Sequence, residues 1–86
     1  MNSSAFTVST TRSVIVPADN IHRTVYLHVI GNGTVYLGGA SVTAANGMPT
    51  EKHTVPFELQ LPAGQPLYAI VAVDTQEVRV LTPDVD

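Results

Sequence analysis

Apolar side chains recur at every second position in several short runs of this chain. The clearest runs span residues 22–30, 57–61 and 77–81, where valine, leucine and phenylalanine alternate with polar or aromatic residues. In a β-strand successive side chains point to opposite faces, so this period places the apolar residues on one face. No segment shows apolar residues at helical spacing over three turns. The pattern therefore favours half-buried strands throughout the chain.

Turn-forming residues separate these runs. They gather at Pro17–Asn20, Gly31–Gly33, Pro62–Gly64 and Asp74–Gln76. Between the last two turns, Leu67–Val73 is apolar on both faces, which predicts a central strand covered on each side. The chain has 86 residues, enough for one domain. We predict an all-β fold over residues 12–82, a single small antiparallel β-sandwich or small β-barrel of about six to seven short strands.

The runs on either side of Gly31–Gly33 are predicted to form a hairpin. Val35 and Leu37 would continue the inward face of the preceding strand. Tyr26 and Tyr36 alternate with the inward residues and therefore point away from the core. We expect these tyrosines either to pair across the two strands or to lie in an interface, where tyrosine is enriched.

A long connection follows this predicted hairpin. Seventeen residues lie from Gly38 to Thr54, and they begin with a glycine pair and include an Asn-Gly turn and a proline. Connections of this length usually carry a function or pack on their own side chains. The glycine pair is predicted to supply the positive φ of a sharp exit from the strand. Residues predicted to contact a partner protein here are Gly39, Val42, Asn46 and Met48.

The two ends of the chain are predicted to lie outside the β-domain. Residues 1–11 are rich in serine and threonine and contain one aromatic residue, Phe6. Two interpretations stay open for them, a frayed terminus or an extended N-terminal arm that becomes ordered against a neighbour, with Phe6 as a contact. Residues 83–86 form an acidic tail.

The composition argues against a nucleic-acid partner and for a protein partner. The net charge is −3, and the four Lys and Arg residues are scattered along the sequence. Nucleic-acid binding needs several cations against phosphates. Charged residues make up 13% of the chain and hydrophobic residues 44%, so some apolar surface is expected to be exposed as an interaction face. The chain has no cysteine, so association is the expected support for its small core, and a free-standing monomer stays open as the alternative because many domains near this size fold alone.

The polar residues do not form a recognisable catalytic or metal-binding pattern. His22 and His28 share a strand face but lie about 20 Å apart at the rise of a strand, too far to bind one metal ion. His53 lies in a polar loop, and Ser41 is not in a G-x-S-x-G elbow. The glycine-rich segments match neither a P-loop nor a dinucleotide fingerprint. We therefore expect no enzymatic activity, no cofactor, no metal ion and no small-molecule substrate.

The first residues show neither the basic segment nor the apolar segment of a signal peptide. No apolar run approaches the roughly 20 residues that span a bilayer as a helix. Synthesis in the cytoplasm without membrane contact is therefore expected.

Four segments of the chain resemble small virion proteins of tailed bacteriophages that infect actinobacteria. They are Thr34–Gly39, Val42–Pro49, Leu67–Ile70 and Glu77–Leu81. The resemblance implies a capsid decoration (cement) protein or minor capsid protein on the exterior of the virion. Its implied partners are the major capsid protein and copies of itself, most simply in a trimer. No catalytic residue is implied.

A second interpretation stays open because the resemblance does not separate head proteins from tail proteins. The chain would then be a head-fibre or tail-associated module that binds a host-surface glycan or another virion protein. An exposed aromatic platform at Tyr26, Tyr36 or Tyr68 would distinguish this interpretation.

Overall fold

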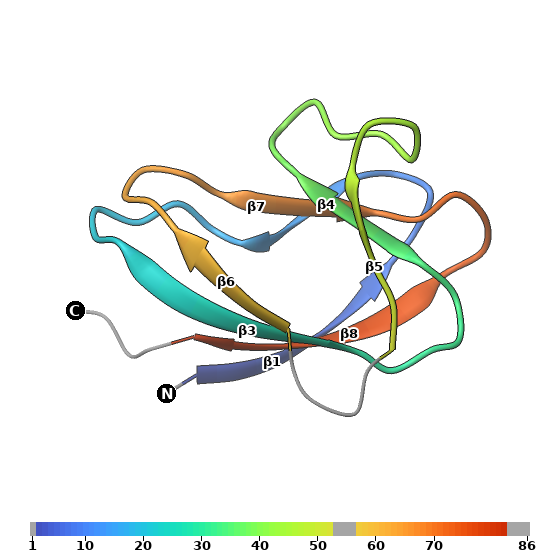
Figure 1. The fold of residues 1–86 in the computed structure, drawn as a ribbon, viewed down its shortest axis with the longest axis horizontal. Coiled ribbons are helices and arrows are strands. Elements are labelled where there is room, and N and C mark those ends of the chain that lie inside the picture. The colour runs from blue at the N-terminus through green and yellow to red at the C-terminus, as the bar shows by residue number, and fades with distance from the viewer. Residues whose placement is uncertain (1, 53–56, 83–86) are drawn as a thin grey trace.

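The chain folds into two antiparallel β-sheets of four strands each (Figure 1). The computed structural model describes residues 2–52 and 57–82, and within those ranges it contains eight strands and no helix. The first sheet, sheet I, has the order β1 (Asn2–Val8), β8 (Gln76–Thr82), β3 (Arg23–Val29) and β6 (Phe57–Leu61). The second sheet, sheet II, has the order β2 (Ser13–Val16), β7 (Leu67–Ile70), β4 (Val35–Gly38) and β5 (Met48–Thr50).

The strands pair as if one long antiparallel hairpin had been rolled up. β1 pairs with β8, β2 with β7, β3 with β6 and β4 with β5. Two further pairs, β3 with β8 and β4 with β7, join these ribbons into the two sheets. Successive strands lie in opposite sheets at every step except β4 to β5. Eight strands connected in this way form a jelly roll.

The core lies between the sheets and consists mainly of valine and leucine. The inward faces predicted for Val25, Leu27 and Val29 are confirmed, with at most 2% of each residue exposed. β-branched side chains suit these positions because they pack well on a pleated surface. Among the residues whose burial is described, the buried cluster consists of Val8, Ile15, Val16, Val25, Leu27, Val29, Val35, Leu37, Leu61, Leu67, Ala69, Val71, Val78 and Val80.

The prediction of a β-sandwich is confirmed, with eight strands instead of about six to seven. One additional strand comes from the segment predicted as an arm. β1 pairs with β8 along its whole length, Val8 is fully buried and Phe6 packs against the core. Phe6 and Val8 already have the period of a strand, but two apolar residues among serines and threonines are a weak signal. The predicted tail, 83–86, lies outside the described residues.

The predicted hairpin around Gly31–Gly33 is wrong, because β3 belongs to sheet I and β4 to sheet II. The turn carries the chain across the sandwich and encloses the side chain of Gln76. The Gly33 N–H donates to Gln76 Oε1 at 3.2 Å, and a Cβ atom at Gly31 or Gly33 would overlap that side chain. A larger residue at either position would force the end of the Gln76 side chain to move, which would disturb this long-range contact.

Two further differences concern sheet II. β7 is central, between β2 and β4, as predicted, but it ends at Ile70, and its outward residues Tyr68 and Ile70 are only half-buried. β5 is a short strand inside the predicted connection, and its Thr50 is buried at 7% exposure. A three-residue strand is too short to show a period, so the sequence could not indicate it.

Candidate functional site

The structure distributes the predicted contact residues over several surfaces. Tyr26 lies on the outer face of sheet I and Tyr36 on the outer face of sheet II, so they do not pair with each other. Phe6 is half-buried and packs partly against the core. The remaining predicted residues, Gly39, Val42, Asn46 and Met48, lie in or next to the loop between β4 and β5.

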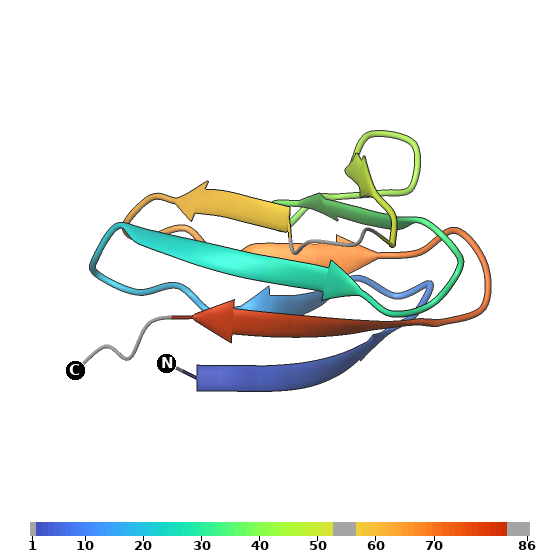
Figure 2. The same cartoon turned by 60° about the horizontal axis from the view of Figure 1, so that its bottom comes forward.

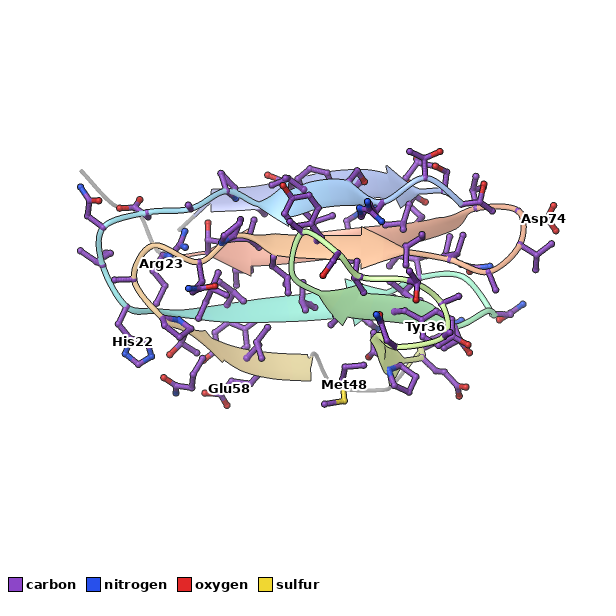
Figure 3. All side chains as sticks on the ribbon, turned by 90° about the horizontal axis from the view of Figure 1, so that it is seen from above. His22, Arg23, Tyr36, Met48, Glu58 and Asp74 are labelled. Atoms are coloured by element: carbon purple, nitrogen blue, oxygen red, sulfur yellow. The ribbon has the colours of Figure 1, made fainter. Side chains whose placement is uncertain are left out.

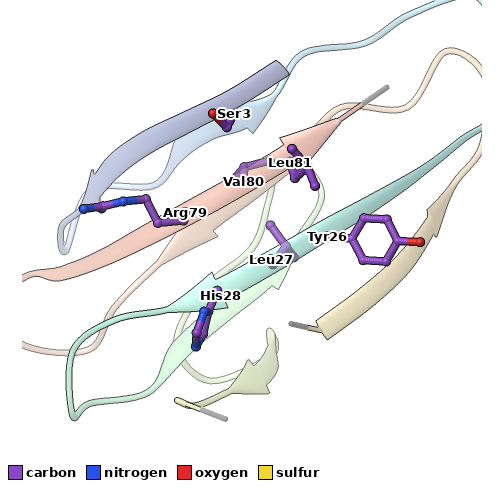
Figure 4. Close-up of a pocket in the computed structure, with 7 residues that line it drawn as sticks. All are labelled: Ser3, Tyr26, Leu27, His28, Arg79, Val80 and Leu81. Atoms are coloured by element: carbon purple, nitrogen blue, oxygen red, sulfur yellow. The ribbon is translucent and has the colours of Figure 1, made fainter. Parts of the chain in front are cut away.

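The outer face of sheet I contains a shallow groove (Figure 4). It has a volume of about 340 Å³ and is lined by Ser3, Tyr26, Leu27, His28, Arg79, Val80 and Leu81. The strand register explains the grouping, because Leu81 of β8 faces Ser3 on one side and Tyr26 on the other. Two residues earlier in β8, Arg79 faces Ala5 of β1 on one side and His28 of β3 on the other. Three strands distant in sequence therefore build one surface.

The two ends of this groove differ in chemistry. Tyr26 and Leu81 offer an aromatic ring and an aliphatic side chain at one end. At the other end, Arg79 Nη1 lies 3.1 Å from Glu77 Oε2, and both side chains are 49% exposed. A salt bridge this exposed contributes little to stability, and a guanidinium carries five N–H donors, so Arg79 retains donors for an external acceptor. The groove can accommodate a flat apolar group with a polar group beside it.

The outer face of sheet II is covered in part by residues 39–47, the β4–β5 loop (Figure 1). Val42 is the anchor of this loop, with 4% of the residue exposed. A Cβ atom added to Gly38 or to Gly47 would lie only 2.8–2.9 Å from this side chain. Arg12 Nη1 also donates to the Val42 carbonyl oxygen at 3.3 Å. The fold itself covers this side chain, and a contact between Val42 and a partner stays a prediction.

A closed turn forms the tip of the β4–β5 loop. The Thr43 N–H donates to Asn46 Oδ1 at 2.7 Å, and the Asn46 N–H lies 3.2 Å from both Thr43 Oγ1 and the Thr43 carbonyl oxygen. The Gly47 N–H donates to the same carbonyl oxygen at 2.8 Å. Asn46 is exposed, but its side chain first serves to close this turn. The loop is thus a shaped element held by its own hydrogen bonds.

The glycine pair behaves differently from its prediction. Positive φ among the described glycines occurs at Gly64, with φ 80°, and at neither Gly38 nor Gly39. A Cβ atom at Gly39 would meet nothing within 4 Å, whereas one at Gly38 would lie 2.8 Å from Val42 Cγ2. Glycine is therefore required at position 38, because the Val42 side chain packs closely against it, and not because of its backbone conformation.

Met48 remains as an accessible apolar residue from the predicted set. It is 64% exposed on β5, at the edge of sheet II, and its side chain extends away from the body in Figure 3. Methionine adapts its shape easily and is common in binding surfaces. In the described ranges, the other large exposed apolar residues are Val14, Ile21, Ile30 and Val73, which lie on separate elements.

Sequence reasoning missed the role of Arg79, Leu81 and His28 beside Tyr26. The alternation did place each of them on an outward face, but it could not show that β8 and β3 are neighbours. Three histidines were considered as metal ligands in the sequence, and one of them, His53, lies outside the described residues. In the described ranges, no three His, Cys, Asp or Glu residues group as metal ligands. The described part of the chain also contains no helix with the length and hydrophobicity needed to cross a membrane.

Comparisons with protein-family models, curated proteins and solved structures found no match for the chain. The jelly roll is used by capsid proteins, lectins and cupins, so the fold alone does not select a function. The function has to be inferred from the chemistry of the protein's own surfaces.

Proposed function

We propose that this protein is a non-enzymatic structural component of a virion, a decoration (cement) or minor capsid protein on the exterior of a tailed-phage head. It would bind the major capsid protein and stabilise the head through non-covalent contacts. The supporting observation is a jelly roll whose interior is filled by its own valine and leucine side chains. Such a body offers rigid outer surfaces, which a structural role requires.

The surface we assign to capsid contact comprises Met48 and the exposed side of the β4–β5 loop. Met48 supplies the largest exposed apolar side chain of β5, and the loop beside it presents the small exposed residues Ala40, Ser41 and Ala45. The turn at Asn46 and the anchor at Val42 hold the loop before a partner binds. Little ordering entropy is then lost on binding, which favours affinity.

Binding to a capsid would also stabilise this small domain. A partner that binds the folded state alone raises the free energy of unfolding by mass action. A domain of 86 residues buries roughly 60–65% of its unfolded surface, so its intrinsic stability is modest. The proposed role and the small core are therefore compatible.

The test uses purified phage heads that lack the protein. Added protein should bind these heads in a cosedimentation assay and raise their melting temperature. Met48→Glu should weaken binding, because it places a charge in an apolar contact. Val73→Glu is a matched control, since Val73 is 67% exposed and lies in the β7–β8 connection. Failure of the wild-type protein to bind such heads would refute the proposal.

The groove on sheet I favours a second candidate function, a head-fibre or tail-associated module that binds a host glycan. An aromatic ring at Tyr26 beside the donors of Arg79 suits the apolar face and hydroxyl groups of a sugar. Tyr26→Ala should abolish binding on a glycan array, while Tyr36→Ala, on the other sheet, should leave it unchanged. Absence of glycan binding by the wild-type protein at millimolar ligand would exclude this candidate.

A further inference from the structure

The free edge of β1 is the least protected strand edge in the described part of the fold. β1 lies at the end of sheet I and pairs with β8 on one side through seven residues, Asn2–Val8 (Figure 2). Its other side presents backbone N–H and C=O groups over about 24 Å at the rise of a strand. The segment contains no charged residue, no proline and no glycine. An edge with these properties is a template for another strand.

The other three edge strands carry features that hinder pairing. β2 has four residues and an irregular register between Val14 and Val16. β5 has three residues, one of which is Pro49. β6 has five residues and presents the charged side chain of Glu58. Short length, irregularity, proline and charge are the means by which proteins protect sheet edges, and β1 uses none of them.

We propose that the free edge of β1 pairs antiparallel with β1 of a second copy of this chain, around a two-fold axis. An antiparallel edge is complementary to itself, because a two-fold rotation brings its donors opposite its own acceptors. The two copies of sheet I then form one continuous sheet. A second copy of the chain is favoured over a charged partner strand, because the β1 edge is neutral and rich in hydroxyl groups.

The side chains of β1 fit this arrangement when Ala5 faces Ala5 of the partner subunit. Ser3 then faces Thr7 of the partner subunit, and Ser4 faces Phe6 of the partner subunit. Each pair joins residues on the same face of the sheet, since the two positions differ by an even number. Ser3, Ala5 and Thr7 are small and exposed, so a strand can approach to the usual spacing.

The nearest like charges across this contact stay apart. Arg79 lies on β8, one strand inward from β1. It would be separated from Arg79 of the partner subunit by three strand spacings, about 14 Å. That distance exceeds the screening length at physiological salt, so the repulsion is small. Phe6, which is half-buried in one copy, gains cover from the second strand.

This inference goes beyond the proposed function and does not depend on it. It concerns the isolated protein, so dimer formation can be refuted while capsid binding is observed, and capsid binding can be refuted while the dimer is observed. A two-fold pair also differs from the trimer implied by the resemblance. A three-fold ring requires a head-to-tail contact, which this self-complementary edge does not supply.

The test is sedimentation velocity of the purified full chain from micromolar to millimolar concentration. We expect a monomer–dimer equilibrium. Ala5→Glu places a carboxylate opposite Arg79 within the chain, which supports the monomer, and places two carboxylates against each other across the two-fold axis. It should raise the dimer dissociation constant by up to about fivefold. Ala63→Glu, an identical change at an exposed position of the β6–β7 turn, at the opposite edge of sheet I, should leave the constant unchanged.

Amide hydrogen exchange of the wild-type protein provides a second readout that needs no variant. Alternate amides of β1 should gain protection as the concentration rises, because those N–H groups become paired only in the dimer. The proposal is overturned if the protein stays monomeric across the range. It is equally overturned if an oligomer forms that Ala5→Glu leaves intact, or if the gain in protection lies outside β1.

Discussion

The substitution Gly38→Ala tests how the β4–β5 loop is fixed on sheet II. An added Cβ atom would lie 2.8 Å from Val42 Cγ2 and 2.9 Å from Val42 Cβ, closer than carbon atoms approach in folded proteins. Val42 cannot easily turn away, because it is β-branched, buried and held through its carbonyl oxygen by Arg12. The loop or the strand must therefore shift.

The neighbouring glycine provides a control that isolates this effect. Gly39→Ala adds the same atom where nothing lies within 4 Å, and neither glycine has positive φ. Both substitutions reduce the entropy of the unfolded chain by a similar amount, so that contribution cancels in the comparison. Overpacking costs about 1–3 kcal/mol, which predicts a difference in Tm between the two variants of roughly 5–20 °C for a domain of this size.

Thermal and urea unfolding followed by circular dichroism would measure this difference. Val42→Ala removes one of the two clashing atoms, so it should reduce the cost of Gly38→Ala in a double-mutant cycle. If Gly38→Ala and Gly39→Ala have free energies of unfolding within about 0.5 kcal/mol of each other, the close packing described here is refuted.

Three further predictions concern stability, each measured by urea unfolding. Val8→Ala should cost about 2 kcal/mol because Val8 is fully buried, and deletion of residues 1–8 should prevent folding; an unchanged Tm after the deletion would show a separable arm instead of β1. Arg23→Met should cost about 1–3 kcal/mol, because the Arg23 guanidinium is buried and donates to two backbone carbonyl oxygens at 2.9 and 3.3 Å, and a cost near zero would contradict this role. Asn46→Pro removes the backbone N–H that closes the loop turn, so it should cost more than Asn46→Ala, and equal costs would argue against that turn.

Only part of the candidate surfaces could be predicted from the sequence. Met48 was predicted from the sequence as a contact residue in the long connection, and the structure leaves it 64% exposed. Val42 has the same kind of neighbours, yet it is buried, because Gly38 and Gly47 open a space for it on the face of sheet II. The local sequence does not distinguish Val42 from Met48, because Val42 becomes buried only when the loop folds back onto the outer face of sheet II.

What the sequence by itself determined is the strand class and the direction of each side chain. Period two is a local property of the backbone, so the inward faces of β3, β4 and β8 could be assigned without knowing their neighbours. The tertiary structure decided which strands are neighbours. β1 pairs with β8 across nearly the whole chain, whereas β3 and β4, which only the five residues 30–34 separate, lie in opposite sheets. The alternation of side chains along a strand is the same whichever strand is its neighbour. Only the packing of the two sheets around one core selects the neighbouring strands, and this choice creates the groove, the site of the loop anchor and the free edge of β1.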